Sequence, residues 1–236
     1  YIIAEAPKGG LKGADIFLGG PFGSTVLGTA NVMMAAVLAK GKTVIECAAC
    51  EPEIADLARF LNKMGAKIRG IGSPRLTIEG VGELKPAEHQ VIPDRIEAGT
   101  FMAAAAITAS ELTLENCNMD HLKAAIYKLR SIGINVEKNN GGCVVSRTGK
   151  IKTTDITTQP HPGFPTDLQA QFMALLALGE GNSVIIEKIF PDRFMHVAEM
   201  NRMSANLRKE GHTVIVSGVD NLTAAPVMAS DLRASA

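Results

Sequence analysis

The sequence predicts an α/β protein whose sheets mix parallel and antiparallel strands and whose chain repeats a β-α-β-α-β-β unit. Apolar helical segments alternate with short β-branched strands along the chain. Helix-ending glycines recur at Gly65 and Gly133, and this spacing indicates a repeat of about 70 residues. Strand-ending glutamates recur in the same way at Glu115 and Glu187. Three helices at equivalent positions of the repeat are also expected to begin with an aspartate, at Asp94, Asp167 and Asp231.

The composition favours some classes of protein over others. With 236 residues, 46% hydrophobic and 20% charged, the chain can bury a large core as one or two domains. Its 24 lysines and arginines balance 24 aspartates and glutamates, so net charge favours neither nucleic acid nor a membrane as partner. A local basic cluster stays open. No apolar run approaches the ~20 residues of a membrane span, and no signal peptide is evident.

The cysteines predict a cytoplasmic protein. Four of them without a secretory signal indicate reduced thiols, and they are Cys47, Cys50, Cys117 and Cys143. Cys47 and Cys50 have CxxC spacing, but no second pair accompanies them. We therefore interpret them as small side chains at a strand end, with a zinc or redox site as the alternative. No other metal spacing and no Ser/His/Asp arrangement is evident, so no metal or cofactor is predicted.

The ends of the chain predict an internal piece of a longer protein. The chain begins without methionine, in an expected strand at residues 1–4. It stops at residues 231–236, where a further helix would begin.

The first domain is expected at residues 1–92. Glu53 in the first turn and Pro52 at the start are typical of a helix N-terminus. The segment at 81–93 lacks helical periodicity and carries two prolines, so we expect it to cross between domains, with a long loop inside one domain as the alternative. The expected elements are strands at 14–18, 43–47, 66–68 and 75–79 and helices at 31–39 and 54–64.

The second domain is expected at residues 93–236 and contains two further repeats. Helices are expected at 94–108, 119–131, 167–178 and 196–207. Strands are expected at 112–115, 134–137, 143–145, 183–187 and 213–216.

A proline-rich approach to an apolar helix points most directly to a site. Pro160, Pro162 and Pro165 predict an extended approach, because each fixes its own φ. Thr166 and Asp167 then supply N-cap chemistry, which places a carboxylate at a positively polarised helix start. A plain cap is one interpretation of Asp167. The other is an anion site, formed where several such helix starts converge.

Two further loops could hold an anion. The glycine-rich turn at residues 19–29 could hold a phosphate through its N–H groups and hydroxyls, but it lacks the lysine of a Walker loop, and a plain turn is an equal interpretation. The loop at 189–196 carries Arg193, which could clamp a phosphate or form a surface pair with Asp192. His196 is interpreted as a helix-start residue.

Several long strings in the sequence resemble the UDP-N-acetylglucosamine 1-carboxyvinyltransferases, which are enolpyruvyl transferases. They are spread over the whole chain: EPEI at 51–54, PDRIE at 93–97, GTF at 99–101, PTDLQAQF at 165–172, RFMHV at 193–197 and ASDLRASA at 229–236. The resemblance implies a two-domain inside-out α/β barrel, each domain made of three β-α-β-α-β-β units. Residues 1–92 would then be the later part of the first domain, and residues 93–236 the first part of the second.

The resemblance also implies an activity. Members of this family transfer enolpyruvate from phosphoenolpyruvate to the 3-hydroxyl of UDP-N-acetylglucosamine and release phosphate, the first committed step of peptidoglycan synthesis. These two substrates are the implied partners, and the sequence predicts no oligomeric state.

The resemblance assigns roles to individual residues. Asp167 would be the general base at the sugar hydroxyl, and Arg233 would hold phosphoenolpyruvate and stabilise charge in the tetrahedral state. Ile189 would touch the UDP-sugar, while Arg193 and Arg95 would line or brace the cleft. The diphosphate would be bound by backbone groups of the turn formed by Gly23, Ser24, Thr25 and Val26.

The chain departs from the family pattern in two ways. The turn at 23–28 differs from the commoner Ser-Val-Gly-Ala-Thr version, so its alignment can slip by one residue. The family's lid cysteine, its N-terminal Lys-Asn pair and a late arginine lie outside this sequence, and none of the four cysteines inherits the lid role. We therefore expect these 236 residues to be inactive alone.

Three rival functions remain. One keeps the chemistry with shikimate 3-phosphate as acceptor, and another is a non-catalytic paralogue that senses a UDP-sugar. The third is a ring-shaped DNA clamp, which needs basic helices. The helix at 31–39 has no charge and that at 167–178 only the aspartate at its start, which argues against a clamp.

Overall fold

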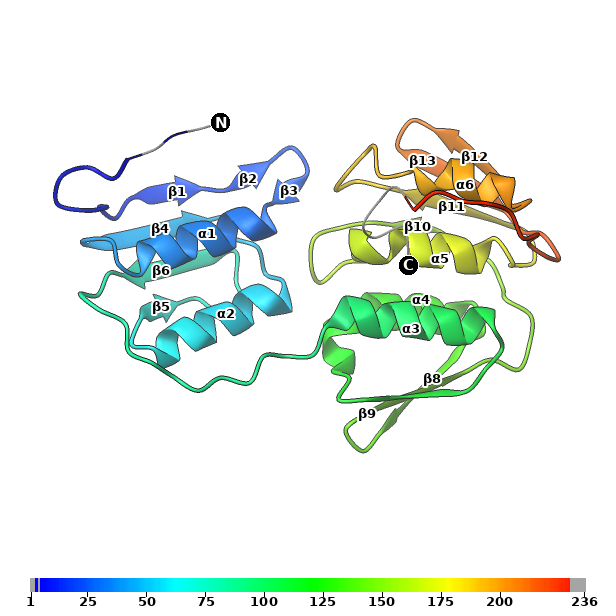
Figure 1. The fold of residues 1–236 in the computed structure, drawn as a ribbon, viewed down its shortest axis with the longest axis horizontal. Coiled ribbons are helices and arrows are strands. Elements are labelled where there is room, and N and C mark those ends of the chain that lie inside the picture. The colour runs from blue at the N-terminus through cyan, green and yellow to red at the C-terminus, as the bar shows by residue number, and fades with distance from the viewer. Residues whose placement is uncertain (1–2, 4, 230–236) are drawn as a thin grey trace. The chain divides into compact units, whose positions relative to one another are not determined.

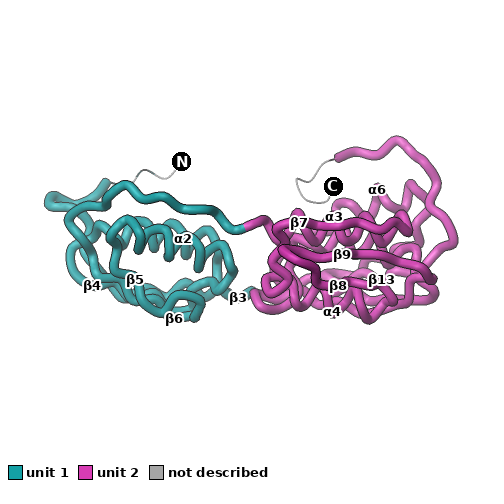
Figure 2. The backbone as a smooth tube through the Cα atoms, turned by 90° about the horizontal axis from the view of Figure 1, so that it is seen from below, with its two compact units in different colours: residues 1–92 teal, residues 93–236 magenta. Residues whose placement is uncertain are grey.

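The computed structural model describes residue 3 and residues 5–229 of the chain. The chain divides into two compact units, Tyr1–Ile92 and Pro93–Ala236, which are coloured separately in Figure 2. We describe each unit by itself. Their assignment to parts of two family domains stays a prediction. The expected helix at Asp231 and the predicted site residue Arg233 lie outside the described residues.

The first unit has a four-stranded mixed sheet, a short hairpin of β2 (Gly19–Gly20) and β3 (Gly23–Ser24), and two helices (Figure 1). The strand order is β1-β4-β6-β5, in which only β1 and β4 run parallel. Its core joins Met33 of α1, Ala58 of α2 and Ile45 and Ile78 of the sheet. The elements are β1 (Asp15–Phe17), α1 (Val26–Ala36), β4 (Lys42–Glu46), α2 (Pro52–Lys63), β5 (Lys67–Arg69) and β6 (Arg75–Glu79).

The second unit has two sheets around one hydrophobic core, and Figure 1 shows its helices α3, α4 and α5 between them. One sheet has the order β7-β9-β8: β7 (Leu112–Glu115), β8 (Asn135–Asn139) and β9 (Gly142–Ser146). The other has the order β10-β11-β13-β12: β10 (Ile156–Thr157), β11 (Asn182–Ile186), β12 (Asn206–Glu210) and β13 (Thr213–Ser217). The helices are α3 (Arg95–Ile107), α4 (Lys123–Ser131), α5 (Gln169–Leu176) and α6 (His196–Arg202), with short 3₁₀ helices η1 (Met119–Leu122) and η2 (Thr166–Leu168).

The sheet topology repeats three times along the chain, and the full β-α-β-α-β-β unit that the sequence predicts is seen in two of these repeats among the described residues. The last three strands of each repeat are antiparallel neighbours in the same order: β4-β6-β5, β7-β9-β8 and β11-β13-β12. In the first and third repeats a preceding strand adds in parallel, as β1 on β4 and β10 on β11. The protein therefore has a mixed α/β fold made of three related repeats.

Two expected helix boundaries are wrong for local reasons. The helix expected from residue 31 begins at Val26, because Thr25 is its N-cap and accepts a hydrogen bond from the Gly28 N–H at 3.2 Å. The helix expected to reach residue 207 ends at Arg202, because Ser204 takes a left-handed φ of 67° and a strand follows. The strand β10 was not expected, since it has only two residues.

Two absences hold for residue 3 and residues 5–229. No helix there is long and apolar enough to cross a membrane. Nor does that part of the chain gather three or more His, Cys, Asp or Glu side chains into a group that could hold a metal ion.

Candidate functional site

The proline-rich approach is not extended, contrary to our expectation. The Gly163 N–H donates to the carbonyl of Pro160 at 2.8 Å, and the Gln159 N–H donates to the carbonyl of Phe164 at 2.9 Å. These bonds fold the run back on itself, which brings Phe164 beside Thr158 at the end of β10. The prolines therefore form a tight turn that leads into η2.

Asp167 is not the N-cap of the expected helix. It is the middle residue of η2, whose cap position is held by Pro165, while α5 begins two residues later at Gln169. Its carboxylate Oδ1 instead accepts a hydrogen bond from Arg193 Nη1 at 2.8 Å. The structure thus joins two predicted site residues that lie 26 positions apart.

Arg193 is held in place from several directions. Its Nη1 also donates to Thr166 Oγ1 at 2.9 Å, and its guanidinium lies 4.5 Å from the centre of the Phe190 ring. Its backbone carbonyl accepts a hydrogen bond from Gln169 Nε2 at 3.3 Å. The Arg193 side chain is 15% exposed and that of Asp167 is 26% exposed, so the pair is largely shielded but reachable from solvent. The alternative of a surface pair with Asp192 is therefore wrong.

Glu187 lies next to this pair and is linked to it through Thr166. Our sequence analysis did not assign it to the site. It follows β11, is fully buried and accepts hydrogen bonds from the Thr158 hydroxyl at 2.7 Å and the Thr166 hydroxyl at 2.9 Å. The only signal in the sequence is an acidic residue directly after a run of apolar strand residues. Its partners are more than 20 positions away, so local patterns do not reveal them.

Ile189 and Arg95 lie on the elements next to the pair. Ile189 is half-buried in the turn directly after Glu187. Arg95 opens α3, and four residues later Gly99 packs so closely on Leu168 of η2 that an added Cβ would lie 2.5 Å from Leu168 Cδ1. The start of α3 therefore lies beside η2. Asp94 caps α3 by accepting hydrogen bonds from two backbone N–H groups, as its place at the helix start predicts.

The predicted diphosphate turn belongs to the first unit. Gly23 and Ser24 form β3, which pairs with β2 (Gly19–Gly20) in a short hairpin, and Gly23 has a φ of 106°. Thr25 is the N-cap of α1 and Val26 its first residue. The turn thus ends at the N-terminus of an 11-residue helix, which is the arrangement that binds phosphate in other proteins.

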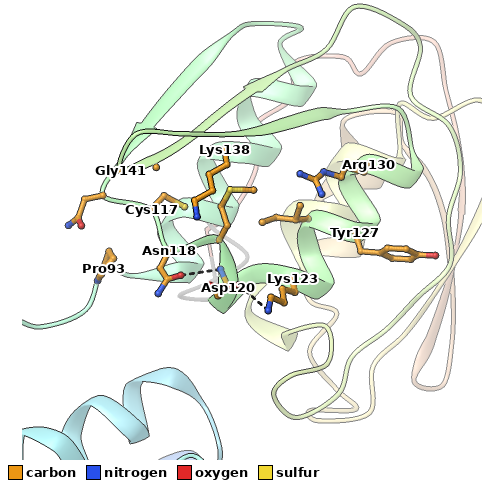
Figure 3. Close-up of a pocket in the computed structure, with 13 residues that line it drawn as sticks. Pro93, Cys117, Asn118, Asp120, Lys123, Tyr127, Arg130, Lys138 and Gly141 are labelled. Atoms are coloured by element: carbon orange, nitrogen blue, oxygen red, sulfur yellow. Dashed lines mark hydrogen bonds and ion pairs between the residues drawn. The ribbon is translucent and has the colours of Figure 1, made fainter.

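A separate hollow of about 770 Å³ lies in the second unit between α4 and the β8–β9 hairpin (Figure 3). Three of its charged side chains already have partners: Lys123 Nζ contacts Asp120 Oδ1 at 2.9 Å, and Arg130 Nη2 donates to the Val136 carbonyl at 2.6 Å. Burial, followed by the neighbouring thiol of Cys143, raises the pKa of Cys117 in this hollow to about 12. None of the predicted site residues lines it.

Comparison with known proteins finds related sequences that match along nearly the whole chain. A sequence profile of the family described as EPSP synthase (3-phosphoshikimate 1-carboxyvinyltransferase) matches residues 3–236. The chain is 54% identical over 236 residues to the UDP-N-acetylglucosamine 1-carboxyvinyltransferase 1 of Caldanaerobacter subterraneus subsp. tengcongensis, and it covers 56% of that protein. It is 52% identical over 231 residues to the UDP-N-acetylglucosamine 1-carboxyvinyltransferase of Methylacidiphilum infernorum and covers 55% of it.

A solved structure supports the fold. The enolpyruvyl transferase NikO from Streptomyces tendae matches 94% of this chain and 55% of its own with a TM-score of 0.81, at 22% identity. The chain therefore spans somewhat more than half the length of the relatives that it matches. Because the profile covers nearly all of the sequence, the chain belongs to the EPSP synthase (3-phosphoshikimate 1-carboxyvinyltransferase) family.

Proposed function

We propose that the complete protein carrying this chain transfers enolpyruvate from phosphoenolpyruvate to the 3-hydroxyl of UDP-N-acetylglucosamine and releases phosphate. The relatives with this name share 52–54% of their residues with the chain over nearly all of it. The reaction would take place in the cytoplasm as the first committed step of peptidoglycan synthesis. The fold would be an inside-out α/β barrel, to which residues 1–92 and 93–236 contribute parts of two domains.

One observation carries the proposal: Asp167 and Arg193 form a hydrogen-bonded pair 2.8 Å apart that remains partly open to solvent. A carboxylate held in one orientation can accept the proton of a sugar hydroxyl as the oxygen attacks. The Arg193 side chain donates two hydrogen bonds, to Thr166 and Asp167, and Nη1 makes both of them. Its Nε and Nη2 therefore have no protein acceptor among the described residues. These nitrogens are therefore suited to an anionic substrate group.

The remaining roles are assigned by similarity. Asp167 is the general base, and Arg233 binds the phosphate or carboxylate of phosphoenolpyruvate. Ile189 contacts the UDP-sugar from the turn beside the pair, and Arg95, the first residue of α3, lines or braces the cleft. The diphosphate is bound at the N-terminus of α1 by Gly23, Ser24, Thr25 and Val26.

The first alternative is a shikimate 3-phosphate acceptor, because the family description carries that activity. The identity to relatives named for the UDP-sugar reaction favours UDP-N-acetylglucosamine. The second is a non-catalytic protein that binds a UDP-sugar. It predicts binding without turnover.

The experiment uses the complete protein that carries this chain. Phosphate release from phosphoenolpyruvate is measured with UDP-N-acetylglucosamine and, separately, with shikimate 3-phosphate. We expect release with the UDP-sugar only, and a loss of about 100-fold or more in kcat for Asp167→Asn. The matched control is Asp192→Asn, an exposed aspartate next to Arg193, which should keep wild-type turnover.

The two alternatives give different results. Release with shikimate 3-phosphate only would mean that shikimate 3-phosphate, and not UDP-N-acetylglucosamine, is the acceptor. Binding of the UDP-sugar without release would favour the sensor. Full activity of Asp167→Asn would remove the general-base role.

A further inference from the structure

Glu187 is a fully buried carboxylate with four hydrogen-bond donors around it. Its Oε1 accepts hydrogen bonds from the Thr158 hydroxyl at 2.7 Å and from the N–H groups of Ile189 at 2.8 Å and Phe190 at 3.0 Å. Its Oε2 accepts a hydrogen bond from the Thr166 hydroxyl at 2.9 Å. A buried carboxylate is costly unless such bonds compensate for its lost hydration, so Glu187 and its donors form one connected network.

Thr166 connects this buried network to the Asp167–Arg193 pair. Its hydroxyl donates to Glu187 Oε2 and accepts from Arg193 Nη1 at 2.9 Å. The same Nη1 donates to Asp167 Oδ1 at 2.8 Å. Because the Thr166 hydroxyl has one proton, committing that proton to Glu187 leaves its lone pairs to receive Arg193.

Glu187 also holds the guanidinium from a second side. Its Oε1 fixes the N–H of Phe190, and the ring of Phe190 lies 4.5 Å from the Arg193 guanidinium. The neighbouring N–H of Ile189, the residue assigned to the sugar contact, is fixed by the same oxygen. One buried carboxylate therefore orients both the pair and the turn beside it.

The first repeat shows that the fold does not require this carboxylate. The residue directly after the corresponding strand β4 is Cys47, with a φ angle of 56°. In the first repeat the N–H of Ala49, two residues past Cys47, is held by Thr29 Oγ1 at 3.0 Å. The third repeat uses Glu187 for the N–H at the same place in the turn, so its carboxylate is a feature of the repeat that carries the pair.

We propose that Glu187 is a positioning residue that acts through the Thr166 hydroxyl to hold Arg193 against Asp167 in the geometry for proton transfer. The proposal rests on the proposed function. It predicts that weakening the Glu187–Thr166 link lowers the rate of the chemical step more than it weakens substrate binding, since misplacing a catalytic group acts mainly on turnover.

The first test compares three variants of the complete protein in the phosphate-release assay. Thr166→Val removes the hydroxyl while keeping the side-chain shape, and Thr166→Ser restores it. Glu187→Gln keeps an oxygen for Thr158, Ile189 and Phe190 but replaces Oε2, the acceptor of Thr166, with a donor. The control is Asn201→Ala, which removes hydrogen bonds to the backbone of Leu207 in the same repeat.

We expect kcat to fall about tenfold or more in Thr166→Val and Glu187→Gln, with the KM for UDP-N-acetylglucosamine within about threefold of wild type. Thr166→Ser should recover most of the lost kcat. Asn201→Ala should lower thermal stability without lowering kcat at 25 °C. The proposal is wrong if Thr166→Val keeps wild-type kcat, if Thr166→Ser rescues nothing, or if Asn201→Ala reproduces the loss.

A second test does not depend on activity. In a crystal structure of the complete protein with Thr166→Val, we expect the distance between Arg193 Nη1 and Asp167 Oδ1 to exceed about 3.5 Å, the limit of a hydrogen bond. A contact retained near 2.8 Å would overturn the positioning role even for an active enzyme. If the wild type releases no phosphate with either acceptor, the proposed function fails, and this distance alone decides the role of Glu187.

Discussion

Asn62 and Asn201 make the same pair of hydrogen bonds in two different repeats. Asn62 Oδ1 accepts from the Ile68 N–H at 2.8 Å and its Nδ2 donates to the Ile68 carbonyl at 2.9 Å. Asn201 makes the equivalent bonds with Leu207, both at 3.0 Å. In each case the carboxamide ties the end of a helix to the strand that follows it, so one device closes the helix-to-strand connection of both repeats.

Asn62→Ala and Asn201→Ala should each lower the free energy of unfolding by about 1–3 kcal/mol, because each leaves a partly buried N–H and carbonyl without their partners. Urea unfolding of the chain measures the change. Asn206→Ala, on an exposed position of β12, is the matched control and should change stability by less than about 0.5 kcal/mol. An equal effect of all three substitutions would contradict the role of the carboxamides.

Helix endings illustrate what the sequence can and cannot predict. Gly65 and Gly133 stop their helices with φ angles of 103° and 92°, as a glycine after an apolar helix predicts. In the third repeat the same place is held by Ser204, with a φ of 67°. A serine has no strong preference for this conformation, so the pattern let the helix run on to residue 207. Local signals thus predict the repeats but miss a boundary where the expected residue type is replaced.

The site was harder to predict from the sequence than the fold. The role of Asp94 as a cap follows from its neighbours, and the structure agrees. Asp167 has similar neighbours but pairs with Arg193, because the turn at the prolines and the short η2 direct its carboxylate elsewhere. Glu187 could not be assigned from local patterns, since Thr158 lies 29 positions away and Thr166 lies 21. Such contacts depend on the packing of whole elements.

Gly99→Ala should lower turnover of the complete protein by about tenfold while changing stability little. The added Cβ would lie 2.5 Å from Leu168 Cδ1 and 2.9 Å from Cδ2, so η2 must shift and carry Asp167 with it. The higher helix propensity of alanine, about 1 kcal/mol, offsets part of the packing cost. Phosphate release and urea unfolding are measured together. Gly82→Ala, where an added Cβ meets nothing within 4 Å, is the control, and unchanged kcat in Gly99→Ala would show that η2 tolerates the shift.

Cys117 should react slowly with iodoacetamide in the folded chain until the solution is strongly alkaline. Burial, then the neighbouring Cys143, raises its pKa from 9.0 to about 12, and alkylation needs the thiolate. The fold thus favours the protonated thiol. Its contribution to stability is complete below pH 9.0, the ordinary thiol pKa, and is lost as the pH rises from there toward about 12.

Mass spectrometry of the peptide containing Cys117 measures the rate of alkylation between pH 7 and the most alkaline pH at which the chain stays folded. In urea the same thiol should react with the ordinary dependence on pH, which provides the internal control. Cys117→Ser identifies the correct peptide adduct. A folded-state rate that rises through pH 8–9 as in urea would mean that solvent reaches the thiol and that burial beside Cys143 does not protect it.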